Sequence, residues 1–594
     1  MANLLTSFNA GVSGLRSAQQ SLYTAGHNLA NAQTRGYTRQ QTVVTDSFYR
    51  NSLGIYDNIL QVGTGTNIVT TRQIRNVFLD EQYRLQVGRE AFYEINRDTV
   101  WSIYDMLGEL DGQNFQGSIN ELEEMLGKFA PSCEDVVYKA ELASIASQFI
   151  ERAQVLQKDL NDYQTSLNKE VKRQVDAIND IVTEIRDLNK KIRKYEAVGE
   201  SANDYRDSRN DLLDQLSEYI NFEVQEQGDG TIMIYSEGGF LLDATNQYYL
   251  STEYESPTSQ LLKPVWANGG DYFLRGALNY SSEQETDIGS LRGLIVARGT
   301  YAADYTSMPT KPQQEDFKNA DGVMDTRAYN EAMKQYREEL EIYNKSVGAS
   351  VIMTTQSQLD TLVHSLVTMI NEVFSPTKEL TLADGSKIRV LDEENALIGD
   401  DENETMGAEL FSRRSCERYT KTKATVLDED GNPQEIDVWQ YNEEDPEDRY
   451  SLYTISQLVV NPAVLQNPSC LGVKYNNQNG GKDGYAHNEL EAFIDIFSQK
   501  IGPLTPDSMS SYTVMGFYQA MVGDLGLLGN VWNGIVENQE LTVSLADDER
   551  QNVMGVSSEE ELSDLIKFQR CYDASSRYIT TVDEMLEYLI ERLA

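Results

Sequence analysis

The sequence is poor in basic residues. Its 594 residues include 50 Lys and Arg against 94 Asp and Glu, so the formal net charge is −44. A nucleic-acid-binding protein needs a basic surface to neutralise phosphates, and anionic membranes attract basic segments. The charge therefore argues against both kinds of partner. It suits a protein that must stay soluble at high concentration.

Long apolar runs are also missing. No run of about 18 apolar residues occurs, so we expect no membrane-spanning helix. The stretch from Met1 to Gly11 has no basic region and no clean apolar core, which predicts that the chain has no conventional signal peptide. On composition alone, the expected compartment is the cytoplasm.

Cysteine and histidine, the residues that most often carry metal and redox chemistry, are scarce. No C-x-x-C pair is present, so the four cysteines predict neither a zinc site nor a disulfide framework, and we expect unpaired, mostly buried thiols: Cys133, Cys416, Cys470 and Cys571. The three histidines have no second His or Cys at ligand spacing: His27, His364 and His487. No H-E-x-x-H, G-x-S-x-G or phosphate-binding P-loop motif occurs. We expect no catalytic residue, no cofactor and no metal site, and therefore no enzyme.

What the sequence does contain is a seven-residue apolar repeat at each end. At the N-terminus a column of mostly small residues runs beside a bulky one: Leu4, Gly11, Ala18 and Ala25, then Phe8, Leu15, Leu22 and Leu29. The C-terminal columns are Leu565, Tyr572, Ile579, Leu586 and Leu593, then Phe568, Ser575, Val582 and Leu589. Such columns predict two helices that each need a partner along one seam. Pairing of the two ends with each other is the simplest solution, and pairing of each end with its own copy in another chain is the alternative.

Between the ends, the sequence predicts a helical rod with β insertions. Residues 136–198 have heptad columns and would form one helix of roughly 90 Å. The predicted fold class is mainly α with β insertions (α+β), with a long helical rod-like domain, terminal helices paired as a coiled coil, and a β-rich outer domain. The expected domains are the terminal helical core (1–50 and 546–594), the rod (51–375 and 451–545, with a β-hairpin region at 222–299 and an insertion at 305–348) and the acidic outer domain (376–450).

Two terminal stretches carry a resemblance. Asn28 to Gln40 contains the pattern A-N-x-x-T-x-G-Y-x-R, and Glu560 to Leu586 matches the corresponding C-terminal signature. Both resemble the axial proteins of the bacterial flagellum, which comprise rod, hook and hook-associated proteins. Interior stretches narrow this to the hook-associated protein 1 family: 63–69 with 75–84, 206–220, and 458–468. The segments 305–348 and 376–450 show no clear match.

The resemblance implies a structural subunit that joins hook to filament as a short ring. It implies export through the flagellum's own type III apparatus without a cleaved signal peptide, so the expected location becomes extracellular. Implied partners are hook protein, a second junction protein of the hook-associated protein 3 type, copies of the same chain, and an export chaperone on the C-terminal helix. The implied assembly interface consists of Leu4, Phe8, Leu15, Leu22, Leu29, Ala30, Asn31, Thr34, Gly36, Tyr37, Arg39, Leu565, Phe568, Tyr572, Ile579, Val582, Leu586, Leu589 and Leu593.

Three alternative functions remain open. A hook or distal-rod protein would polymerise alone into tubes. A surface adhesin or glycan-binding protein would use the β regions at 222–300 and 376–450. An enzymatic domain hidden in those β regions is the third alternative.

Overall fold

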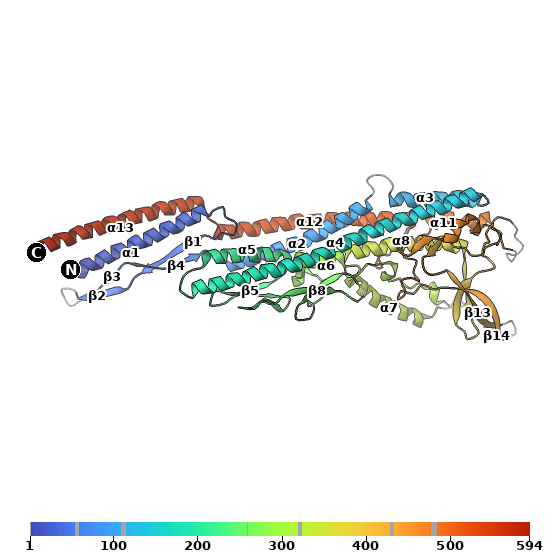
Figure 1. The fold of residues 1–594 in the computed structure, drawn as a ribbon, viewed down its shortest axis with the longest axis horizontal. Coiled ribbons are helices and arrows are strands. Elements are labelled where there is room, and N and C mark those ends of the chain that lie inside the picture. Colours follow the sequence, from blue (N-terminus) through green and yellow to red (C-terminus); the bar gives the residue numbers. More distant parts are fainter. Residues whose placement is uncertain are drawn as a thin grey trace.

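A computed structural model describes residues 2–53, 59–108, 114–257, 259–318, 324–427, 433–476 and 484–593. The molecule is a long rod, with the two ends of the chain together at one tip (Figure 1). The predicted class, mainly α with small β insertions, is confirmed. The predicted domain boundaries remain a prediction.

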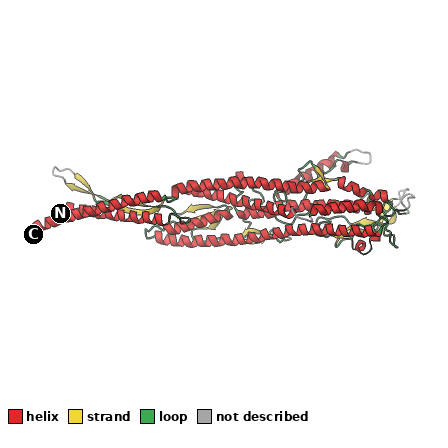
Figure 2. Cartoon of the chain, turned by 90° about the horizontal axis from the view of Figure 1, so that it is seen from above, coloured by secondary structure: helices red, strands yellow, loops and turns green. Residues whose placement is uncertain are grey.

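Long helices run along the rod, as Figure 2 shows from above. They are α2 (Val77–Leu107), α4 (Val136–Glu196), α8 (Val351–Phe374) and α12 (Val514–Met554). The single helix predicted over 136–198 is therefore confirmed as α4, which has 61 residues. Its predicted heptad column is fully buried, which explains why so long a helix is stable here: Val171, Ile178, Ile185 and Ile192. The Asp135 side chain caps its first turn by accepting from the Val137 amide.

Shorter helices fill the spaces between the long ones. They are α3 (Phe115–Phe129), α5 (Asn203–Tyr219), α6 (Ser290–Arg298), α7 (Thr326–Lys345), α9 (Pro462–Gln466), α10 (His487–Leu490) and α11 (Ala492–Ser498). Asn203 is the first residue of α5 and does not cap it. Ala202 occupies the cap position, and the Asn203 side chain donates instead to the Thr71 carbonyl.

The β-hairpin region expected over 222–299 ends earlier than predicted, because its last part, up to and beyond Val296, forms α6. All nine of its residues are buried, so the segment has no polar face and its helical period cannot be seen. The predicted hairpin at its start is confirmed: β5 (Glu223–Glu226) pairs with β6 (Ile232–Ser236), which pairs with β7 (Gly239–Leu242). A second antiparallel pair follows, β8 (Leu250–Tyr254) and β9 (Leu262–Trp266).

The acidic segment 376–450 holds a four-stranded antiparallel sheet at the end of the rod far from the termini (Figure 1). The order is β10-β11-β14-β13, from β10 (Thr377–Thr381), β11 (Lys387–Leu391), β13 (Tyr419–Leu427) and β14 (Pro433–Tyr441). Strand β12 (Phe411–Arg413) pairs instead with β15 (Leu458–Val460), which lies beyond the predicted boundary at 450. At least one strand pair, β12 with β15, therefore joins this segment to the part of the chain that follows it.

The second part of the rod, 451–545, is not wholly helical. A short hairpin of β16 (Lys500–Pro503) and β17 (Ser511–Thr513) separates α11 from α12. The polar insertion contains the expected helix, α7, in which only Tyr336 and Tyr343 are buried. The main core therefore lies among the long helices.

Candidate assembly site

The two terminal helices, α1 (Ala2–Ala30) and α13 (Ser558–Leu593), lie side by side beyond the rest of the rod (Figures 1 and 2). The two ends therefore pack against each other within one chain. From Leu565 to Leu589, the less exposed side chains of α13 are those of the two predicted columns: Leu565, Phe568, Tyr572, Ser575, Ile579, Val582, Leu586 and Leu589. The heptad pattern therefore identified the seam of α13 correctly.

On α1 the small column faces this seam most closely. Ala18 and Ala25 are 5% and 3% exposed. At Gly11 an added Cβ would lie only 2.8 Å from Cγ1 of Ile579. The bulky column of Phe8, Leu15, Leu22 and Leu29 is half-buried. Leu4 and Leu593 lie in the two helices, and their side chains fall outside the described part of the structure.

A β-hairpin covers another face of α1. Its arms are β1 (Gln40–Asp46) and β4 (Thr66–Gln73), and β2 (Tyr49–Leu53) with β3 (Ile59–Gly63) extends it. Hydroxyl pairs join helix to hairpin: Ser17 to Thr66 and Thr24 to Thr42, each at 2.9 Å between oxygens. Residues 64 and 65 connect β3 to β4.

The N-terminal signature forms the loop between α1 and β1, and Asn28 organises it. The Asn28 Oδ1 atom accepts from the Tyr37 hydroxyl at 2.7 Å and from the Gln40 amide at 3.0 Å. Its Nδ2 donates to the Gln40 carbonyl at 2.9 Å. Gly36 has φ of +75°, a conformation that side chains other than glycine disfavour, and a Cβ there would approach Asp211. The signature therefore encodes one closed turn.

Arg39 joins this turn to the start of α13. Its Nε donates to Glu561 Oε1 at 2.7 Å, and its Nη1 donates to Glu560 Oε2 at 3.1 Å. The Arg39 amide donates to the Met554 carbonyl at 2.9 Å, at the end of α12. Glu561 is 2% exposed and also accepts from Asn28, so its charge is neutralised by Arg39 and held inside the turn. The two terminal signatures thus recognise each other.

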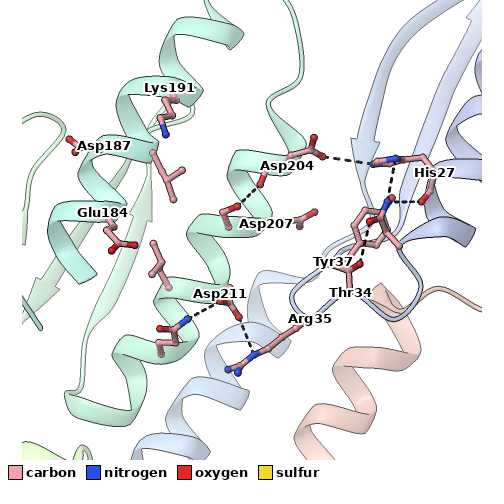
Figure 3. A pocket seen from close by; sticks show the side chains of 15 residues that line it. His27, Thr34, Arg35, Tyr37, Glu184, Asp187, Lys191, Asp204, Asp207 and Asp211 are labelled. Carbon is pink, nitrogen blue, oxygen red and sulfur yellow. Dashed lines mark hydrogen bonds and ion pairs between the residues drawn. The ribbon is translucent and has the colours of Figure 1, made fainter. Parts of the chain in front are cut away.

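The same loop docks on α5, which belongs to the rod (Figure 3). The Arg35 Nε atom lies 3.3 Å from Asp211, and the His27 Nε2 atom lies 3.9 Å from Asp204. Between them Asp207 accepts from Gln73 of β4 at 2.6 Å. Three acids spaced along one face of α5 therefore meet the signature loop and the hairpin.

A polar cleft of about 830 Å³ separates the loop from α5 and the C-terminal part of α4. Burial raises the pKa of Asp207 to about 6. Burial also raises the pKa of the Tyr37 phenol, and the nearby charge of Asp207 is the second cause of the shift. Tyr37 therefore remains a hydrogen-bond donor. The cleft contains no arrangement of nucleophile and base, and its groups act as a connection between the terminal pair and the rod.

Not every residue of the N-terminal signature takes part in this connection. Ala30 and Thr34 are exposed, and the Thr34 hydroxyl donates to the Asn31 side chain at 3.2 Å. Sequence reasoning missed Asn28 and Glu561, which lie inside the two matched stretches, and it missed the acids of α5. Their spacing at positions 204, 207 and 211 on a helix was the available signal.

Within the described residues, no helix is both long enough and apolar enough to cross a membrane. A rod of long helices with its two ends paired at one tip (Figure 1) defines a class of elongated, mainly helical proteins.

Comparisons with known proteins identify the class more closely. Residues 101–381 match the flagellar hook-associated protein FlgK helical domain, and residues 550–592 match the flagellar basal body rod FlgEFG protein C-terminal family. The chain is 24% identical to flagellar hook-associated protein 1 of Bacillus subtilis, covering 97% of this chain and 96% of that one. It is 22% identical to the protein of the same name from Salmonella typhimurium, covering 98% and 99%. The FlgK hook junction protein of Burkholderia pseudomallei aligns with a TM-score of 0.49 at 12% identity, over 80% of this chain and all of that one.

The chain thus resembles flagellar hook-associated protein 1 over nearly its full length and carries a match to the FlgK helical domain. The full-length relatives that it resembles are flagellar hook-associated proteins. The resemblance inferred from the two terminal signatures and the three interior stretches is thereby confirmed.

Proposed function

We propose that this chain forms a short ring between hook and filament, and that α1 and α13 are its assembly elements. The observation that supports this most is the outward face of α13. Apolar side chains there are about half exposed although α1 already fills the seam: Ile566, Met585, Tyr588 and Ile590. Apolar surface of this extent on a single helix is a site for further contact.

Copies of the same chain are the proposed cover of this face. Side-by-side terminal pairs would bury the outward residues against neighbouring pairs. The 19 residues expected from the resemblance are those of the seam and the signature, and they build the pair within one chain. The exposed apolar residues of α13 beside them are not among the 19 and would meet the next chain.

The resemblance to the family suggests specific partners for the ring. One end of the ring meets hook protein, and the other meets a second junction protein of the hook-associated protein 3 type. Before assembly an export chaperone covers the C-terminal helix, since an exposed apolar helix promotes aggregation in a free subunit. The chain leaves the cell through the flagellar export apparatus and acts outside it in a structural, non-enzymatic role.

Deletion of the gene from its source organism, with return of the full chain as control, tests this role. We expect hooks of normal length that lack filaments, because filament subunits have no platform, and restored filaments on complementation. Loss of the hooks themselves would indicate a hook or distal-rod protein. Complete flagella, with altered attachment to mucin or cell-wall glycans, would indicate an adhesin.

A further inference from the structure

Cys133 and His487 lie 354 positions apart in the chain and meet at the end of the rod far from the termini. Cys133 follows the 3₁₀ turn Ala130–Ser132, in the corner between α3 and α4, and His487 is the first residue of α10. The Cys133 Sγ atom is 3.5 Å from His487 Nδ1, and His487 Nε2 is 3.9 Å from Glu134 Oε2. One potential ligand atom from each of the three residues lies within 4.8 Å of the other two.

The imidazole is already oriented by the backbone. Its Nδ1 atom lies 3.0 Å from the Ala130 carbonyl oxygen, and a carbonyl can only accept a hydrogen bond. The proton therefore resides on Nδ1, and Nε2 carries the free lone pair on the side of Glu134. Metal-bound histidines are held in the same way, with the second ring nitrogen donating to a carbonyl or carboxylate.

The three groups form a site that opens to solvent on one side. Cys133 is fully buried, whereas the His487 and Glu134 side chains are 42% and 51% exposed. Burial raises the pKa of the Cys133 thiol to about 11, so the free group is protonated. The nearby Lys139 Nζ is buried without a hydrogen-bond partner among the described residues, and its nearest charge is Asp400 at 3.5 Å. An ammonium in that position favours the thiolate.

The donor set selects the kind of ion. A thiolate, an imidazole and a carboxylate together suit zinc, which takes four ligands with metal–ligand distances of about 2.0–2.3 Å. Glu134 is exposed and can move toward the ion. The spacing along the chain indicated no such site, because the fold alone brings Cys133 to His487.

We propose that Cys133, His487 and Glu134 bind one zinc ion, with water as the fourth ligand. The thiol proton leaves to solvent as the ion binds, since only the thiolate is a ligand. The bound ion connects the α3–α4 corner to α10. It thereby stabilises the far end of the rod.

Cobalt(II) is the direct probe, because a thiolate bound to cobalt gives a charge-transfer band that carboxylates alone do not give. Co²⁺ is titrated into the reduced full chain without oxygen, and Zn²⁺ is then added to displace it. We expect a band that saturates at one ion per chain and disappears with zinc. A magnesium titration controls for cations that gather on the acidic surface and produces no band.

Variants assign the ligands. Cys133→Ser abolishes the band, and His487→Ala weakens apparent affinity by more than the ~10–100-fold expected for loss of an outer partner. Cys470→Ser is the matched control, a second buried thiol outside the cluster, and leaves the band unchanged. His487 is partly exposed, so His487→Ala tests the site even if Cys133→Ser misfolds. No band in the natural chain, or a band that survives Cys133→Ser, would overturn the proposal.

Discussion

The close approach of α1 to α13 makes a sharp prediction about two glycines of one helix. Gly11→Ala places a methyl group 2.8 Å from Cγ1 of Ile579 and 3.0 Å from Cδ1 of Tyr578. Gly26→Ala is the matched control, since a Cβ at Gly26 meets nothing within 4 Å. Both changes add alanine to a helix interior and differ only in what the methyl group touches.

The magnitudes follow from two opposing effects. Alanine in place of glycine stabilises a helix interior by about 1 kcal/mol. Overpacking a closed interface costs about 1–3 kcal/mol. We therefore expect Gly26→Ala to stabilise the terminal pair by up to about 1 kcal/mol, and Gly11→Ala to be neutral or to destabilise it by up to about 2 kcal/mol. The two variants should differ by about 1–3 kcal/mol, or about 5- to 150-fold in the local opening constant.

Hydrogen exchange read by mass spectrometry measures this locally in the full chain. Peptides from residues 9–29 report the opening of α1, and peptides from α4 report the rod, which should not change. Adding Ile579→Ala to Gly11→Ala removes the clashing Cγ1 and should restore part of the lost protection. Equal protection in Gly11→Ala and Gly26→Ala would refute the close approach of the two helices.

Three further predictions concern the connection and the pair. Arg39→Met leaves Glu561 buried without its cation and should destabilise the connection by about 3 kcal/mol. Hydrogen exchange in β1 should then be faster. Adding Glu561→Gln should recover part of the lost stability, and strictly additive effects of the two changes would contradict the coupling. Asp207 has a folded pKa of about 6 against 3.8 for the ordinary group, so its burial penalty is absent at low pH and grows as pH rises through 6. Asp207→Asn should therefore stabilise the chain against urea near pH 8, by at most about 3 kcal/mol, and have no effect near pH 4. An equal gain in stability at both pH values would show that the buried charge of Asp207 is not the cause. Ile579→Asp should block incorporation into flagella while the circular dichroism of the rod changes little, and normal motility of that variant would show that the terminal seam is dispensable.

The terminal helices and α4 were predictable because each buries one stripe and exposes the rest. A seven-residue column is then visible in the sequence, as in Val171 to Ile192 of α4 and Leu565 to Leu586 of α13. Helix α6 was not predictable, since it is buried all round and its two arginines are buried as well. Arg292 pairs with Glu237, and Arg298 pairs with Glu255. Nothing local in the sequence announces such long-range partners.

The candidate site was predictable in outline and not in its contacts. The signature located the turn that contains Gly36 and Arg39, because a glycine between polar residues ends a helix. The partners of that turn are far away in the chain: Glu561 lies 522 positions beyond Arg39, and the acids of α5 come from the rod. Pairing over such separations is decided by the packing of the whole fold.

The most direct test of the central claim is immunogold electron microscopy of intact flagella from the source organism, with antibody raised against residues 376–450. This segment lies at the end of the rod far from the paired termini (Figure 1), so the terminal assembly elements do not cover it. The account predicts label at a single point between hook and filament. Label along the whole hook, or label elsewhere on the cell with flagella bare, would contradict it.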